Sequence, residues 1–228
     1  MHKRVETLLQ SPAIRLAGVV ARVGPQTVST GFPGLDRLLP GGGWPDGSLV
    51  EILSDRQGVG ELSLLIPTLA VLSSGDRWLA WVSPPHIPYG PALAARGVAL
   101  SRVLLVHARP GRDQLWAVEQ MLAAGTCRVV LAWLDEEVDA RALRRLQLAA
   151  ESGKSTGFLF RSGALRVLPT PAALRLGLQP TETGLQVKVL KCRGRSGTGV
   201  IVDVDDAMAE PQLPTPAARS ARPRLLRH

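Results

Sequence analysis

The chain has 228 residues, of which 45% are apolar, and it carries a formal net charge of +8. This length suffices for one sizeable core, and the lack of an apolar run near about eighteen residues argues against a membrane span. Two cysteines, Cys127 and Cys192, and four scattered histidines form no metal-binding spacing, so we expect no metal and no cofactor. Charged residues and Pro12 interrupt the apolar residues near the N-terminus, so this segment lacks the apolar stretch of a secretory signal. We therefore expect a cytoplasmic location.

Composition divides the chain into three segments. Residues 1–27 predict a short helix and a linker, residues 28–206 an α/β domain, and residues 207–228 a flexible tail rich in proline, alanine and arginine. Within the domain, amphipathic helices alternate with short apolar strands, which is typical of βαβ units with a mostly parallel sheet. The expected helices are 32–39, 61–72, 91–96, 113–124 and 139–151, and the expected strands are 49–53, 78–82, 103–106, 128–133 and 156–160.

After Pro169 the pattern changes. Two β-rich runs, 185–192 and 199–204, surround the glycine-rich segment RGRSGTG. Such a pattern predicts an antiparallel hairpin that extends the sheet at the C-terminal end of the domain.

A glycine-rich loop follows the first apolar strand, and it has the layout of a phosphate-binding loop. Such a loop needs a lysine for the phosphates and a hydroxyl for magnesium directly after its last glycine. Here Glu61 and Leu62 follow Gly60, so a carboxylate stands where the cation belongs. The residues of this candidate nucleotide site are Ser54, Asp55, Arg56, Gln57, Gly58, Gly60 and Glu61.

Two further positions of a nucleotide-hydrolysing site lack the required chemistry. The strand 128–133 ends in Trp133 where an aspartate would order magnesium, and Pro85 falls where a glutamate would orient the attacking water. Phosphoryl transfer depends on such groups for positioning and charge stabilisation. We therefore expect no hydrolysis, and we expect Trp81 and Trp133 to fill part of the empty site. The tripeptide Gly153-Lys154-Ser155 follows a helix and precedes a strand, which predicts a helix end and not a phosphate loop.

These motifs carry a family resemblance. The run from STG (Ser29 to Gly31) through GGGWPDG (Gly41 to Gly47) and VEI (Val50 to Ile52) resembles the RecA recombinase superfamily. With LSDRQGVGELSLL, RWLAWVSPPHIPYGPAL and RALRRLQLAAESG, it looks like the ImuA family of RecA-like accessory proteins. That resemblance implies a RecA-like core and a nucleoid-associated, non-catalytic adaptor of SOS-induced translesion DNA synthesis. The implied partners are RecA, ImuB and an error-prone DnaE-type polymerase.

Two alternatives remain open at this point. The chain also resembles SulA, the cell-division inhibitor that blocks FtsZ assembly, which would make it a regulator of a protein polymer. A weak ATPase, in which Arg56 replaces the missing lysine, is the second alternative. The sequence leaves the oligomeric state undetermined.

Basic residues suggest contact with DNA or with an acidic partner. Arg141, Arg144 and Arg145 share one helix face at i, i+3 and i+4. The glycine-rich hairpin carries Lys188, Lys191, Arg193 and Arg195, and the tail carries a possible docking segment of Arg219, Arg222, Arg224, Leu225, Leu226 and Arg227. No interleaved aromatic residues accompany them, so any DNA binding should be driven by the phosphate backbone.

Overall fold

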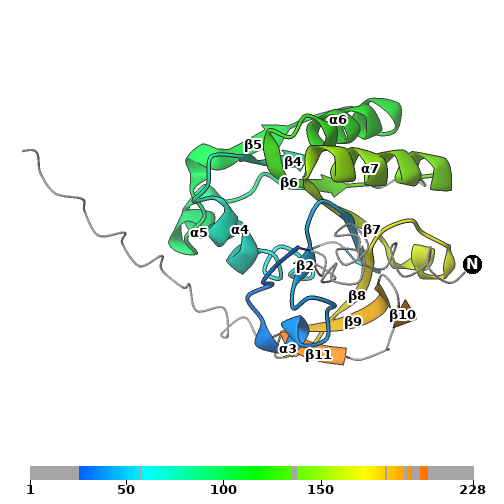
Figure 1. Ribbon diagram of the computed structural model, residues 1–228. Helices are drawn as coiled ribbons and strands as arrows, with labels where there is room; N and C mark the ends of the chain where they lie inside the picture. Colours follow the sequence, from blue (N-terminus) through cyan, green and yellow to red (C-terminus); the bar gives the residue numbers. More distant parts are fainter. Residues whose placement is uncertain are drawn as a thin grey trace, which may run out of the picture.

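The structure is a computed structural model, and it describes residues 26–56, 58–134, 138–182, 184–192, 195–196 and 201–204. One large sheet runs through the domain, with helices on both faces (Figure 1). Its strands are β3 (Leu49–Ser54), β4 (Trp78–Val82), β5 (Val103–Val106), β6 (Cys127–Trp133), β7 (Thr156–Ser162), β8 (Leu174–Pro180), β9 (Leu185–Cys192), β10 (Arg195–Ser196) and β11 (Ile201–Val204). The spatial order is β10-β9-β8-β3-β7-β6-β4-β5, and β11 pairs with β9.

The sheet is mixed. β3 lies between β7 and β8 and is parallel to both, and β6, β4 and β5 continue the parallel portion. β9 runs antiparallel to β8, and β10 and β11 both pair antiparallel with β9. The expected pairing of 185–192 with the run near 199–204 is therefore confirmed, whereas β8 had not been expected as a strand.

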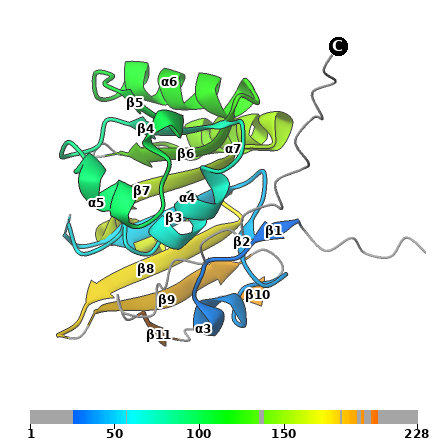
Figure 2. The ribbon, with the colours of Figure 1, turned by 90° about the vertical axis from the view of Figure 1, so that its left-hand side faces the viewer.

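Helices cover the two faces of the sheet separately. α6 (Arg112–Ala123) and α7 (Ala140–Gly153) lie side by side on one face, and α3 (Pro33–Asp36), α4 (Ile66–Leu72) and α5 (Gly90–Ala95) lie on the other side (Figure 2). Two one-turn helices, η1 (Leu100–Arg102) and η2 (Gly163–Val167), and a small antiparallel sheet of β1 (Thr27–Val28) and β2 (Trp44–Pro45) complete the domain.

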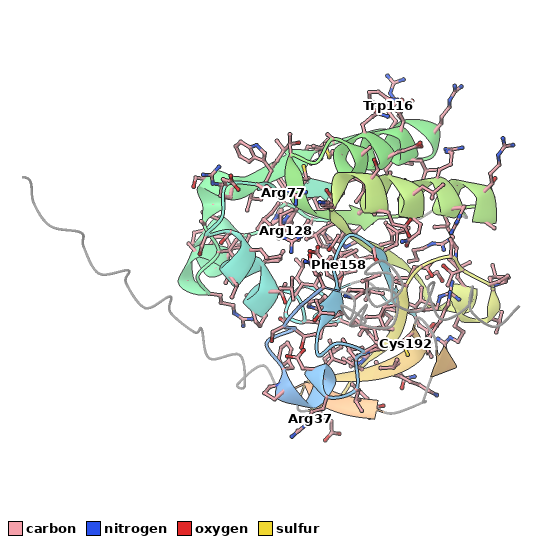
Figure 3. The ribbon with its side chains drawn as sticks, viewed as in Figure 1. Arg37, Arg77, Trp116, Arg128, Phe158 and Cys192 are labelled. Carbon is pink, nitrogen blue, oxygen red and sulfur yellow. The ribbon has the colours of Figure 1, made fainter. Side chains whose placement is uncertain are left out.

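Each face has its own buried cluster. On the α4 side, Trp44, Leu69 and Phe158 belong to one core, and on the α7 side Leu122 and Leu146 belong to the other. Phe158 lies within the protein, while Trp116 extends from α6 into solvent (Figure 3). Burial of these apolar side chains from both faces explains why the central strands read as continuous apolar runs.

The sequence of α7, the longest of the described helices, explains where that helix begins and ends. Asp139 caps α7, because its side chain accepts a hydrogen bond of 2.6 Å from the backbone N–H of Ala142. Leu143 and Leu146 face the core, and Lys154 ends the helix in the left-handed conformation. The helix end predicted from Gly153-Lys154-Ser155 is confirmed, although Lys154 and not the glycine takes the left-handed position.

Several boundaries differ from expectation. The strands 78–82 and 103–106 are confirmed to the residue as β4 and β5, but the expected helix 32–39 shrinks to the four residues of α3. The segment 1–27, apart from its last two residues, lies outside the described residues, and so does the short helix predicted within it. The tail 207–228 lies outside them as well. Among the described helices, none is both long and apolar enough to cross a membrane.

Candidate functional site

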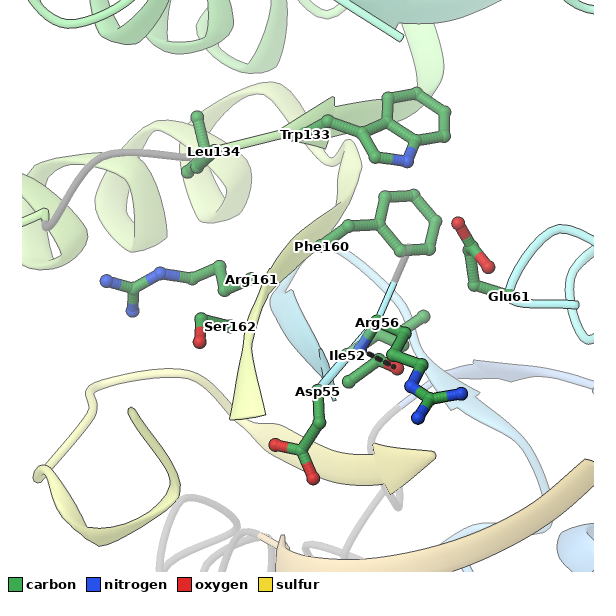
Figure 4. A pocket seen from close by; sticks show the side chains of 10 residues that line it. Ile52, Asp55, Arg56, Glu61, Trp133, Leu134, Phe160, Arg161 and Ser162 are labelled. Carbon is green, nitrogen blue, oxygen red and sulfur yellow. Dashed lines mark hydrogen bonds between the residues drawn. The ribbon is translucent and has the colours of Figure 1, made fainter. Parts of the chain in front are cut away.

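The loop after β3 borders a cavity of about 200 Å³ at the carboxyl end of the parallel strands (Figure 4). Five of the predicted site residues line it: Ser54, Asp55, Arg56, Glu61 and Trp133. Residues that the sequence did not single out, most of them from β7, complete the wall: Ile52, Leu134, Phe160, Arg161 and Ser162. Gly58, Gly60 and Pro85 are not among the lining residues, and Gln57 lies outside the described residues.

The loop does not lead into a helix, which corrects the predicted helix 61–72. Residues 61–65 form turns, and α4 begins only at Ile66. Pro67 explains the late start, because proline has no N–H and fits only the first turn of a helix. A phosphate loop relies on a helix N-terminus that begins at the loop itself. The geometry of such a loop is thus missing together with its lysine.

Glu61 turns back onto its own loop. Its Oε1 accepts a hydrogen bond of 3.1 Å from the backbone N–H of Gly58, and the side chain is buried, with the residue 9% exposed. Backbone N–H groups of this kind cradle the phosphate in a phosphate loop. Here the chain supplies its own carboxyl group to one of them. Oε2 of Glu61 is buried and has no hydrogen-bond partner among the described residues.

Aromatic rings form the adjoining wall of the cavity. Trp133 and Phe160 stack with ring centroids 4.5 Å apart, and Trp81 lies behind Trp133 at 6.1 Å. Both indoles are buried, but only Trp133 lines the cavity. Figure 4 shows the Glu61 carboxyl group on the side of the loop that faces the rings of Trp133 and Phe160. That the two indoles fill part of a former nucleotide site stays a prediction.

Two arginines line the cavity: Arg161 is buried and Arg56 is exposed. Arg161 pairs with the buried Glu51 at 2.6 Å, and Arg166 holds Asp55 through two bonds of 2.8 and 2.9 Å. Arg56 lies in the exposed part of the loop. No group of three or more metal-binding side chains occurs in the part of the chain that the structure describes. The site therefore offers surfaces for contact, and of the two arginines that line it only Arg161 is held in a buried ion pair.

Sequence reasoning missed the strongest electrostatic feature of this region. Glu51 on β3 is fully buried and pairs with Arg161 on β7 and with Arg175 on β8, the latter at 2.7 Å. Each of the three charged residues lies within a mostly apolar strand. That pattern in the sequence could have indicated a buried ion pair. The three side chains tie the central strands together next to the cavity.

The predicted basic helix face lies on α7. Arg141, Arg144 and Arg145 are exposed, whereas Leu143 and Leu146 are buried, as the spacing predicted. Arg145 pairs with Glu119 of α6 at 3.2 Å. Contact of this face with DNA or with a partner stays a prediction.

The basic hairpin is less convergent than expected. Nζ of Lys191 is held by the backbone oxygens of Thr170 and Ala172, at 2.5 and 3.0 Å, so it turns toward the preceding loop. Lys188 is exposed on β9. The side chain of Arg195 and all of Arg193 lie outside the described residues. The same is true of the predicted docking segment in the tail, namely Arg219, Arg222, Arg224, Leu225, Leu226 and Arg227.

Comparison with known proteins identifies the family. The model of the family "Cell division inhibitor SulA" matches residues 47–157, from the turn before β3 to the start of β7. The cell division inhibitor SulA of Edwardsiella piscicida is 36% identical over 115 residues, which cover 49% of this chain and 68% of that protein. The chain belongs to the SulA family.

A second relative has the same name. SulA of Pectobacterium carotovorum is 33% identical over 98 residues, which cover 43% of this chain but only 58% of the relative. The crystal structure of SulA from Pseudomonas aeruginosa is 30% identical and is covered over 98% of its length, against 50% of this chain, with a TM-score of 0.42.

Family membership overturns several expectations drawn from the sequence. The assignment to the ImuA family and to a RecA-like core is wrong, because the central segment matches the SulA family. The role as an adaptor of translesion synthesis is wrong for the same reason, and so are RecA, ImuB and a DnaE-type polymerase as partners. The glycine-rich turn and the alternating βαβ pattern carried the resemblance to RecA-like proteins, and a fold-level pattern of this kind does not determine function.

Proposed function

We propose that the protein is a non-catalytic inhibitor of cell division that acts by binding FtsZ and limiting its assembly. The observation that carries the proposal is the 36% identity to a cell division inhibitor over 115 residues. Those residues make up 68% of the relative, so the proposed activity draws on most of a protein of that name.

The geometry of the loop supports binding in place of catalysis. Glu61 offers no positive charge to a phosphate, and its carboxyl group already accepts the N–H of Gly58. α4 starts too far along the chain to direct its N-terminus at the loop. Transfer of a phosphoryl group needs positioned cations. We therefore infer that no hydrolysis accompanies the inhibition, and that the protein works through its surface.

The place and time of action form part of the same proposal. An inhibitor of FtsZ must meet it in the cytoplasm, and we propose action there, during the SOS response. Nucleoid association was expected only with a DNA-bound role, and it would require that the exposed arginines of α7 contact DNA. Strong dependence of DNA affinity on salt would be the sign of such contact.

Sedimentation of FtsZ polymers tests the function directly. FtsZ is assembled with GTP, with and without an equimolar amount of the purified protein, and the pelleted fraction is measured. We expect less FtsZ in the pellet, and heat-unfolded protein serves as the control for non-specific effects. An unchanged pellet at a several-fold molar excess of the protein would remove the proposal.

A further inference from the structure

The edge of the sheet formed by β5 is open among the described residues. β5 ends the strand order and pairs only with β4, in parallel, through the register Ala80 with Leu104 and Trp81 with Leu105. The backbone N–H of Ser83 donates to the carbonyl of Val106 at 2.8 Å, so the polar backbone groups of Val106 point toward β4. Since successive residues of a strand point these groups in opposite directions, those of Val103 and Leu105 point outward.

Apolar side chains accompany these outward backbone groups. Leu104 is 38% exposed and Leu105 is 39% exposed, and they point to opposite faces of the sheet edge. Leu100, in η1 just before the strand, is 43% exposed. Proteins usually protect a free edge with charges, proline or a bulge, but VLLV contains none of these. An exposed apolar edge of this kind marks a site for an added strand.

The end of β5 is held in place before any partner arrives. Ser83 follows β4 with a φ of 49°, a left-handed conformation that is uncommon for a residue other than glycine. Its hydroxyl lies 3.1 Å from the carbonyl oxygen and 3.3 Å from the backbone nitrogen of Ala108. This clasp fixes the segment after β5 to the end of β4. A partner would thus meet an edge that is already ordered, which lowers the entropic cost of docking.

The charges around the edge indicate what chemistry would fit. The segment from Arg96 to Arg112 contains further arginines at 102 and 109 and no carboxylate. The nearest acidic residues along the chain on either side of this segment are Asp76, before β4, and Asp113, in α6. The guanidinium of Arg102 donates a hydrogen bond of 2.9 Å to the backbone carbonyl of Asp76. An antiparallel second copy would bring these arginines together, so charge favours a different partner.

We propose that β5 is a docking edge for an extended segment of a partner protein that carries carboxylates at its ends and adds to the sheet as a further strand. Main-chain hydrogen bonds to Val103 and Leu105 would supply affinity, and the arginines would select acidic flanks. The inference deepens the proposed function, on which it rests for the partner: the segment would belong to the division protein that is inhibited.

Peptide binding tests the edge itself. The probe is a fluorescent peptide of alternating valine and threonine with glutamates at both ends, compared with a version that has lysines at both ends, and affinity is read from anisotropy. Leu105→Pro removes the outward N–H, and proline is tolerated at a strand edge. Leu105→Lys keeps the backbone donor but places a charge on the edge, and Leu148→Lys, at a 47% exposed position of α7, is the matched control.

We expect the glutamate-ended peptide to bind the wild type and Leu148→Lys alike, and to bind Leu105→Pro at least about tenfold more weakly, the loss of one good interaction. Leu105→Lys should also bind more weakly, with circular dichroism showing that both variants are folded. Equal affinity for the two peptides, no binding by the wild type, or full binding by both Leu105 variants would overturn the proposal. Self-association of the wild type that Leu105→Pro abolishes would assign the edge to a second copy and overturn it as well.

FtsZ sedimentation with the same variants separates the two proposals. Loss of inhibition in Leu105→Pro, with Leu148→Lys active, supports the edge as the contact with FtsZ. If the wild type inhibits FtsZ and Leu105→Pro does so equally, FtsZ docks elsewhere and this inference fails while the proposed function stands. If the wild type does not inhibit FtsZ, the proposed function fails, and the peptide measurement still decides whether β5 accepts an acidic strand.

Discussion

Oε1 of Glu51 lies 2.6 Å from Nη1 of Arg161, in a pair whose side chains are 0% and 3% exposed. Arg175, on β8, contacts the other oxygen of Glu51, so a single carboxylate forms ion pairs with two buried guanidinium groups. Each charged group lost its hydration on folding, and the mutual contacts compensate for that loss together with the backbone carbonyls that accept from Arg161 and Arg175. Removal of Glu51 would therefore leave both arginines buried without a counter-ion.

Removal of Glu51 should therefore destabilise the fold strongly. We expect Glu51→Ala to lower the free energy of unfolding by about 3–5 kcal/mol, because it leaves two guanidinium groups buried without an anion. Urea unfolding followed by tryptophan fluorescence measures the effect. Glu119→Ala, which breaks the more exposed pair with Arg145, is the matched control and should cost less than about 1 kcal/mol. Equal losses in the two variants would contradict this account of the buried cluster.

The contact between α6 and α7 gives a second prediction with an unusual sign. Replacing a helical glycine by alanine normally stabilises a helix by about 1 kcal/mol. At Gly153, however, a Cβ atom would lie 1.9 Å from the carbonyl oxygen of Leu122. We expect Gly153→Ala to destabilise the protein by about 1–3 kcal/mol, because the two helices must move apart. The melting temperature measures it, and the exposed neighbour Ser152→Ala should change it little.

Restoring the missing lysine should not restore chemistry. In Glu61→Lys we expect no release of phosphate from ATP above that of the wild type, because α4 begins at Ile66 and the end of β6 carries Trp133 in place of a carboxylate. A malachite-green assay with magnesium checks this, beside a known ATPase as the positive control. Turnover by the wild type that Arg56→Ala abolishes would instead support the atypical ATPase.

Because of Cys127, the stability of the folded protein should decrease at alkaline pH. Burial, the largest cause, raises the pKa of its thiol above the ordinary 9.0, and a hydrogen bond with the Thr126 side chain and the charge of Arg77 oppose this only in part. The unfolded chain therefore ionises first, and the stabilising contribution is present below the unfolded pKa and is lost as the pH rises.

Measurement of unfolding at about pH 8 and pH 10 tests this prediction. The wild type should lose more stability over that interval than Cys127→Ala, and the comparison cancels the titration of other groups. Alkylation of Cys127 by iodoacetamide should be slow in the native protein and fast in urea. A native rate equal to the rate in urea would contradict the prediction.

Local signals in the sequence were sufficient for some of the regular elements. The apolar runs of β4 and β5 stood between clear turn residues, and α7 had a capping aspartate and a buried stripe. The start of α4 was missed although Pro67 marked it, because the search for a phosphate loop favoured a helix directly after Gly60. The prediction followed the expected motif, although Pro67 indicated a helix that begins just before it.

The site depended on long-range partners that no local pattern reveals. That Asp55 would meet Arg166, or that Glu51 would meet both Arg161 and Arg175, follows from the pairing of β3 with β7 and β8. Lys191 looked like a member of a basic surface and instead binds two backbone oxygens. Of the basic residues predicted to contact partners, Lys191 and Arg145 already make contacts within the fold.

The central place of β3 also has a consequence for synthesis of the chain. β3 begins at Leu49, but its two neighbours, β7 and β8, start only at Thr156 and Leu174, when most of the domain has been made. Until they emerge from the ribosome, both edges of an apolar strand stay unpaired, and such species aggregate readily. The domain therefore cannot close its core piece by piece from the N-terminus, and we expect its yield in the cell to depend on chaperones that shield nascent chains.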